Sequence, residues 1–222
     1  MEFSSRILVS QDWLTFLLTG CFLLLAASKY LYPRRFSLFL KLPINDAFFK
    51  VYGKEHNLRH PFNIILFVIQ IVSVSVFVYL FLETFQFSDS SENPYLFLHI
   101  ATIFTVFVLL KFSVEKIVAA VFSIEPVIDR YLFHKLGIRN YAALILFGVN
   151  LLLVYAVEPR PQIMLGIAVL LVFISIIGLV YSYNKNRKLI ASNLFQFILY
   201  LCTLEISPYI ILYKLLFIEV IT

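Results

Sequence analysis

The chain has 222 residues, of which 61% are hydrophobic and only 14% are charged. Soluble domains are usually about 45–50% apolar and about 25% charged, so this composition excludes an ordinary soluble domain and a disordered chain. In a soluble protein the net charge of +5 would raise nucleic acid as a partner, but here the charges lie between apolar runs. The sequence therefore predicts an integral membrane protein that binds no nucleic acid.

Six apolar runs follow one another along the chain, each close to the ~20 helical residues that cross a bilayer core of ~30 Å. The predicted spans are residues 13–32, 62–82, 95–115, 140–157, 162–183 and 193–214. No internal repeat, low-complexity tract or soluble domain separates them. We expect one integral-membrane domain over residues 1–222, an all-α, polytopic bundle of six transmembrane helices.

The distribution of Lys and Arg predicts the orientation of the bundle. Fifteen of these 18 residues fall in three alternate segments, 29–59, 111–139 and 185–188. The other three are Arg6, Arg160 and Lys214. Because Lys and Arg favour cytoplasmic loops, the prediction is a multi-pass protein of the bacterial inner membrane with both termini in the periplasm.

The first basic loop, residues 29–61, also contains large apolar side chains. They are Phe36, Leu38, Phe39, Leu40, Phe48 and Phe49. Basic residues interleaved with aromatic rings suit the membrane interface, where they meet anionic lipid headgroups. A surface that docks another protein is the alternative interpretation, and both stay open. Membrane lipids are expected partners in either case.

The second basic loop contains a pattern typical of a short helix. Pro126 suits a first helical turn and Gly137 suits a C-terminal stop. Five apolar residues share one helical face between them: Val127, Ile128, Tyr131, Leu132 and Leu136. We predict one short interfacial amphipathic helix over 126–136 that lies on the cytoplasmic surface.

Two histidines in the first basic loop, His56 and His60, are one helical turn apart. That spacing can hold zinc, but Arg59 lies between them and no cysteine or carboxylate cluster is near. A basic interfacial loop is the favoured interpretation. The chain also lacks a phosphate-binding glycine loop and a nucleophile motif. The sequence predicts no catalytic, metal or cofactor-binding residues, no cofactor and no enzymatic activity.

Glu205 is the one acidic residue in the sixth predicted span. A helical rise of ~1.5 Å per residue from Asn193 places it ~18 Å from the cytoplasmic end, close to mid-bilayer. We expect it to face the bundle interior and to be protonated, because an ionised carboxylate is costly there. Pro208 removes a backbone donor and predicts a kink. Cys202 and Tyr209 share the face of Glu205.

Other polar residues fall at similar estimated depth in different spans. They are Ser73, Ser75, Thr102, Thr105 and Asn150. This pattern predicts a polar belt around Glu205, with Asn150 as its first partner. Such a belt either carries protons or ions, or fixes helix packing through interhelical hydrogen bonds. The packing interpretation is favoured, because no second intramembrane carboxylate completes a relay.

The stretch from Phe197 to Pro208 contains the pattern Leu-Tyr-Leu-Cys-x-Leu-Glu-Ile-x-Pro. It resembles the C-terminal part of a membrane family of Bacteroidota known as domain of unknown function 4271. The resemblance implies an inner-membrane protein of such a bacterium and directs attention to Cys202, Glu205 and Pro208. It implies no established activity.

Three functions are weighed against these features. The first is a non-enzymatic subunit, or an assembly or accessory factor, of a larger membrane complex with membrane-protein partners. The alternative is a small proton-coupled transporter or ion-conducting protein centred on Glu205. A lipid-modifying enzyme ranks third.

Overall fold

The computed structural model describes residues 12–42, 45, 47–53, 60–85, 95–121, 125–157, 159–174 and 177. All regular secondary structure in these ranges is helical, which confirms the predicted all-α class. The helices are α1 (Asp12–Leu31), α2 (Pro33–Leu40), α3 (Ala47–Tyr52), α4 (Pro61–Thr84), α5 (Leu96–Val121) and α6 (Glu125–Tyr155). A further apolar helix, Pro161–Ile174, follows α6.

Among the described residues, α1, α4, α5 and α6 are long and apolar enough to cross a membrane. This finding agrees with a membrane-embedded protein. Helix Pro161–Ile174 coincides with the first part of the fifth predicted span. The sixth predicted span, 193–214, lies outside the described residues. The total of six spans therefore stays a prediction.

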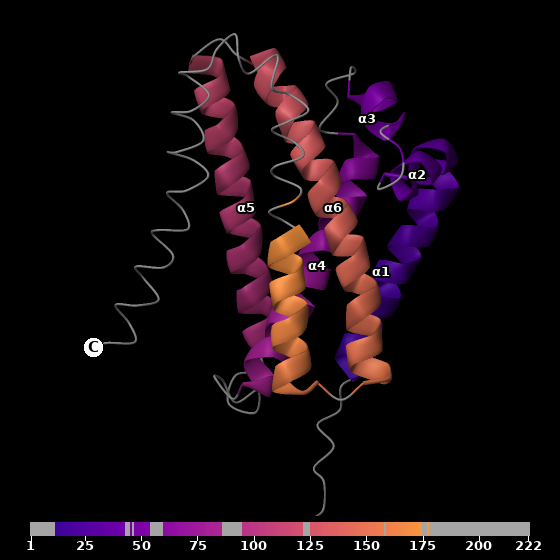
Figure 1. Cartoon of the computed structure of the whole chain (residues 1–222), viewed down its shortest axis with the longest axis vertical. Helices are drawn as coiled ribbons and strands as arrows, with labels where there is room; N and C mark the ends of the chain where they lie inside the picture. Colours follow the sequence, from indigo (N-terminus) through magenta and orange to yellow (C-terminus); the bar gives the residue numbers. More distant parts are fainter. Residues whose placement is uncertain are drawn as a thin grey trace, which may run out of the picture.

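The long helices run along a common axis, and consecutive ones are antiparallel (Figure 1). Helix α4 is central, because it packs against α1, α5 and α6. Helices α4 and α6 run parallel to each other. The short helices α2 and α3 lie beside the first turns of α6, at what we call the cap end of the bundle (Figure 1).

A stripe at helical spacing explains why α4 is central. Its members, all buried, are Asn63, Leu66, Gln70, Ser73 and Phe77. A matching stripe on α6 comprises Asn140, Ala143, Phe147 and Asn150. A hydrogen bond between Ser73 and Asn150 sets an offset of 77 residues between the two helices. The same offset aligns the other members of the stripes in depth, so polar groups point inward while the remaining faces stay apolar.

The predicted helix stop at Gly137 is wrong, because α6 continues without a break from Glu125 to Tyr155. Residues 126–136 are therefore the first turns of a long helix, not a separate surface helix. Gly137 has a packing role instead. A Cβ built on it would lie 2.8 Å from Cε1 of Phe49, so the glycine makes room for this ring of α3. A glycine within a helix can mark a close contact as well as an end.

The first basic loop forms α2 and α3, and three of its aromatic rings are buried within the chain itself. Phe39, Phe48 and Phe49 join Phe62 of α4 and Phe133 of α6 in one core, which we call the aromatic cap. The ring of Phe48 stacks on that of Phe133 with centroids 5.6 Å apart. Packing within the chain accounts for these rings, whereas the membrane-interface and protein-docking interpretations of the loop as a whole stay predictions.

The opposite end of the bundle is held by an indole ring. Trp13 of α1 packs edge-on against Tyr79 of α4, with ring centroids 5.2 Å apart, and against Phe97 of α5 at 5.1 Å. The Tyr155 hydroxyl of α6 donates a hydrogen bond to Oγ1 of Thr15 of α1, 3.0 Å away. Aromatic packing therefore joins three long helices at this end, and a hydrogen bond joins α1 to α6.

Candidate functional site

The polar layer between α4 and α6 is the first candidate site. The Nδ2 atom of Asn150 donates to the carbonyl oxygen of Ser73 at 2.7 Å, and both residues are fully buried. Among the described residues, Oδ1 of Asn150, Oγ of Ser73 and Oε1 of Gln70 have no hydrogen-bond partner. Buried polar atoms are nearly always satisfied, so these three atoms have unused capacity for a donor.

Packed apolar side chains enclose this polar layer on both sides along the bundle axis. Phe39 and Phe62 of the aromatic cap lie toward one end. Leu80 and Leu153 lie toward the other, and all four are buried. Apolar side chains therefore bound the polar layer at both ends, which suits interhelical packing better than passage of a hydrated ion through this interface.

The structure places only part of the predicted polar belt together. Ser73 and Asn150 meet, and Ser75 is buried on α4. The hydroxyls of Thr102 and Thr105 donate to carbonyls of their own helix, Leu98 and Ala101, at 2.7 Å each. Thr102 is exposed. The remaining predicted site residues, Cys202, Glu205, Pro208 and Tyr209, lie outside the described residues.

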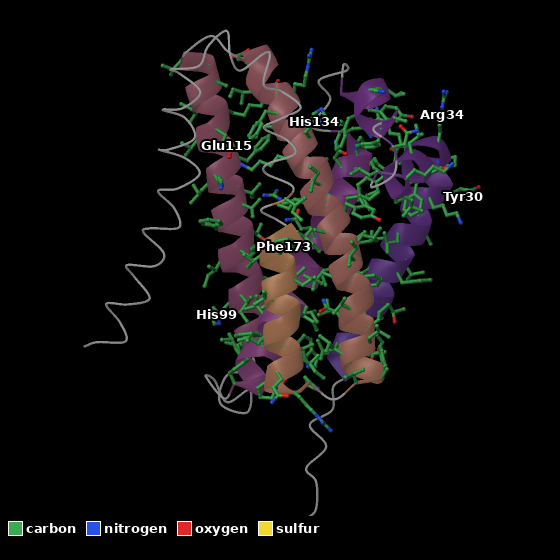
Figure 2. The ribbon with its side chains drawn as sticks, in the orientation of Figure 1. Tyr30, Arg34, His99, Glu115, His134 and Phe173 are labelled. Carbon is green, nitrogen blue, oxygen red and sulfur yellow. The ribbon has the colours of Figure 1, made fainter. Side chains whose placement is uncertain are left out.

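Two ion pairs join the end of α5 to the first turns of α6. Nζ of Lys135 lies 2.8 Å from Oε1 of Glu115, and both side chains are largely buried. The ammonium of Lys135 also lies 5.6 Å from the centre of the Tyr131 ring. The second pair, Lys116 with Asp129, is more exposed. Figure 2 shows Glu115 on α5 beside α6 at the cap end.

The cap also holds a buried histidine and a basic outer surface. The ring of His134 stacks on Phe49, with centroids 4.1 Å apart. On the outside, Arg34 projects away from the bundle (Figure 2), and Lys50 is exposed on α3. The guanidinium of Arg35 lies 4.1 Å from the centre of a tyrosine ring of α3. Helices α2 and α3 contain three basic and no acidic residues.

No group of three or more His, Cys, Asp or Glu residues that could hold a metal ion occurs in the part of the chain that the structure describes. His60 instead starts α4, because its Nδ1 accepts a hydrogen bond from the backbone N–H of Phe62 at 3.2 Å. Its ring also packs against Tyr32 at 5.0 Å. The other histidine of the predicted pair, His56, lies outside the described residues.

Sequence reasoning missed two features of these sites. Gln70 was overlooked, although its spacing from Asn63 and Ser73 places the three on one face of an otherwise apolar helix. The pairing of Glu115 with Lys135 joins residues on two helices, and a pattern within one helix does not predict it.

The family model of the domain of unknown function DUF4271 matches residues 14–216. No curated protein and no solved structure matches the chain. The match includes every helix described above except the start of α1.

Proposed function

We propose that this chain, which belongs to the DUF4271 family, works without catalysis as a subunit or assembly factor of a larger membrane complex. In this proposal it crosses the bacterial inner membrane six times, with both termini in the periplasm and the aromatic cap on the cytoplasmic side. The split of basic residues between alternate loops supports that orientation.

The observation that carries the proposal is the fixed basic surface of the cap. Short helices such as α2, with eight residues, and α3, with six, are unstable alone in water. Ordering each residue costs about 1–2 kcal/mol of backbone entropy, and here buried aromatic rings offset it. The result is a preorganised surface that presents Arg34 and Lys50 outward. A preorganised charged surface suits an acidic protein partner, because little further ordering is needed on binding.

The test is co-purification from native membranes in mild detergent. The variant combines Arg34→Glu with Lys50→Glu, and the control is Arg160→Glu, an exposed residue at the opposite end. We expect wild type and control to retain a partner protein at fixed stoichiometry, and the double variant to retain about tenfold less or lower. A monodisperse wild-type protein without any partner, or equal retention by all three, would overturn the proposal.

The alternative is a proton-coupled transporter or ion-conducting protein centred on Glu205. What favours it is the unused acceptor capacity of Gln70, Ser73 and Asn150, since a protonated carboxyl group is a donor. Proton flux into liposomes that contain the purified protein tests it. If Glu205 carries protons, Glu205→Gln abolishes flux at normal expression. If Glu205 only packs, Glu205→Gln is nearly silent, and Glu205→Leu weakens folding by leaving partners unpaired.

A further inference from the structure

A groove of about 220 Å³ lies between α4, α5 and α6, near the cap end of the bundle. Most of its walls are apolar side chains, which include Ile64 of α4, Val108, Leu109 and Phe112 of α5, and Leu136 of α6. The polar residues that also line it, Asn63 and Arg139, already have interaction partners. Ile64 is 52% exposed and Leu109 is 49% exposed, so apolar surface remains open. The groove therefore suits an apolar occupant.

The helix Pro161–Ile174 is directed toward this groove from the opposite end of the bundle. Both this helix and α5 begin at the end opposite the cap and run toward the cap (Figure 1). Ile174 is 13 residues after the first residue of its helix, and Leu109 is 13 residues after the first residue of α5. At an equal rise of ~1.5 Å per residue the two lie at similar depth. A continuation of the helix beyond Ile174 would therefore run along the groove.

The described part of this helix is too short to cross a bilayer. Its 14 residues span ~21 Å, whereas a bilayer core of ~30 Å needs ~20 helical residues. The sequence after Ile174 contains no charged residue before Lys185, which opens the basic segment 185–188. The other two basic segments include α2, α3 and the start of α6, which lie at the cap end. Because Lys and Arg favour one side of the membrane, the chain is expected to reach the cap end before Lys185.

The spacing of residues predicts which side of the continuation faces the groove. In the described part, Met164 is fully buried and Leu171 packs against the core of the bundle. Ile177 is 52% exposed and lies on the outer face. At helical spacing from Leu171, the inner face continues with three small residues, Ser175, Gly178 and Ser182. Small residues let helices approach closely in a membrane, so this face fits a groove that three helices already bound.

We propose that residues 175–183 continue the helix Pro161–Ile174 and occupy this groove, with the small residues toward its walls. The occupant is thus a segment of the same chain, not a lipid or a partner protein. It covers the exposed sides of Ile64 and Leu109 and brings the segment 185–188 to the cap end, where α2 and α3 present their basic residues. The proposal needs membrane embedding but no protein partner, so it fails separately from the function proposed above.

Photocrosslinking identifies what covers the groove. Leu109 is replaced by the photoreactive residue p-benzoylphenylalanine, the protein is illuminated in native membranes, and mass spectrometry of the digested protein identifies the adduct. We expect the adduct on residues 175–183. The same replacement of Ile103, on the outer face of α5, should give no adduct with that segment. An adduct of position 109 with a lipid, with residues 193–214 or with another protein, in place of 175–183, would overturn the proposal.

Two neighbouring substitutions test the face. Gly178→Phe places a ring on the side toward the groove, so it should lower the melting temperature in detergent and abolish the adduct at position 109. Ile177→Phe places the same ring on the outer face and should change neither. If Gly178→Phe does not fold, the adduct formed without it still decides which segment occupies the groove. Equal behaviour of two folded variants would contradict the assignment of the small residues to the groove.

Discussion

The aromatic cap and α5 reverse the usual relation between hydrophobicity and burial. Three rings of the cap come from the short basic helices α2 and α3, yet Phe39 has no exposed surface. Helix α5 is apolar over most of its 26 residues, yet Ile103 is 69% exposed and Val121 is 72% exposed. In a membrane protein, an apolar side chain on a long helix is free to face lipid, so apolar composition identifies a span without identifying the core.

The same contrast applies to polar groups. Helix α4 turns Gln70 and Ser73 inward against α6, whereas α5 satisfies Thr102 on its own backbone and leaves it exposed. Lipid offers no hydrogen-bond partner, so each polar side chain is directed either to another helix or back to its own. The position of polar residues is therefore a better guide to the interior of this bundle than the position of apolar ones.

The largest expected effect separates the cap from α5 directly. Phe39→Ala removes a ring that contacts Phe48, Phe62 and Tyr141, so we expect the free energy of unfolding to fall by about 3–5 kcal/mol. Ile103→Ala on the outer face of α5 should change it by less than about 0.5 kcal/mol. Denaturant unfolding in detergent measures both values. Equal losses would mean that the outer face of α5 is packed against protein.

The next effect compares the two ion pairs between α5 and α6. Lys135→Met leaves the carboxylate of Glu115, only 3% exposed, without its partner, and should cost about 3–5 kcal/mol. Lys116→Met breaks the more exposed pair and should cost about 0–1 kcal/mol. Adding Glu115→Leu to Lys135→Met should restore most of the loss. No restoration would show that Lys135 stabilises the cap through another contact, such as the Tyr131 ring.

Replacing either of two glycines of α6 by alanine should change stability by a smaller amount, and the two changes should have opposite signs. Gly137→Ala pushes a methyl group toward the ring of Phe49, and overpacking of about 1–3 kcal/mol should outweigh the gain of about 1 kcal/mol in helix propensity. Gly148 has open space around it, so Gly148→Ala should stabilise the protein by up to about 1 kcal/mol. Thermal melting of the two variants shows whether each substitution raises or lowers the stability of the protein. A stabilised Gly137→Ala variant would contradict the close contact of α3 with α6.

The smallest effect concerns single polar side chains. Asn150→Leu loses the hydrogen bond to Ser73 and should cost about 0.6 kcal/mol, with about 1.7 kcal/mol as the upper bound for such bonds in membrane proteins. Thr102→Val should be near zero, because the hydroxyl bonds only its own helix. Chemical unfolding of both variants in one detergent compares them. A larger loss for Thr102→Val would place that residue in a contact.

Much of this fold could be predicted from local sequence patterns, because long apolar runs need no knowledge of their neighbours. The runs at 13–32 and 62–82 coincide closely with α1 and α4. The predictions failed where a residue's role depends on which other helix packs against it. Gly137 has the same sequence signal whether it ends a helix or admits the ring of Phe49, and only the position of α3 decides between them.

The candidate sites show the same division. The estimated depths of Ser73 and Asn150 place both in one predicted polar belt, and the structure joins these two residues by a hydrogen bond. The cap could not be predicted, because its rings from α2, α3 and α4 pack against Phe133 of α6, which is far from them in the chain. A basic, aromatic loop that lies on lipid has the same composition as one that folds onto its own protein. Composition alone does not show whether a side chain contacts lipid or another part of the same protein.

Amide hydrogen exchange in nanodiscs is the sharpest check on the cap, because it reads the order of each segment in the wild-type protein. We expect residues 33–40 and 47–52 to be folded onto the bundle as α2 and α3, with their rings in the aromatic cap. Isolated helices this short exchange almost as fast as unfolded chain, so slow exchange there arises only from tertiary packing. We predict protection of both segments, with loss of protection in Phe39→Ala. Exchange of both segments in wild type at the rate of an unstructured peptide would show that α2 and α3 are not packed on the bundle.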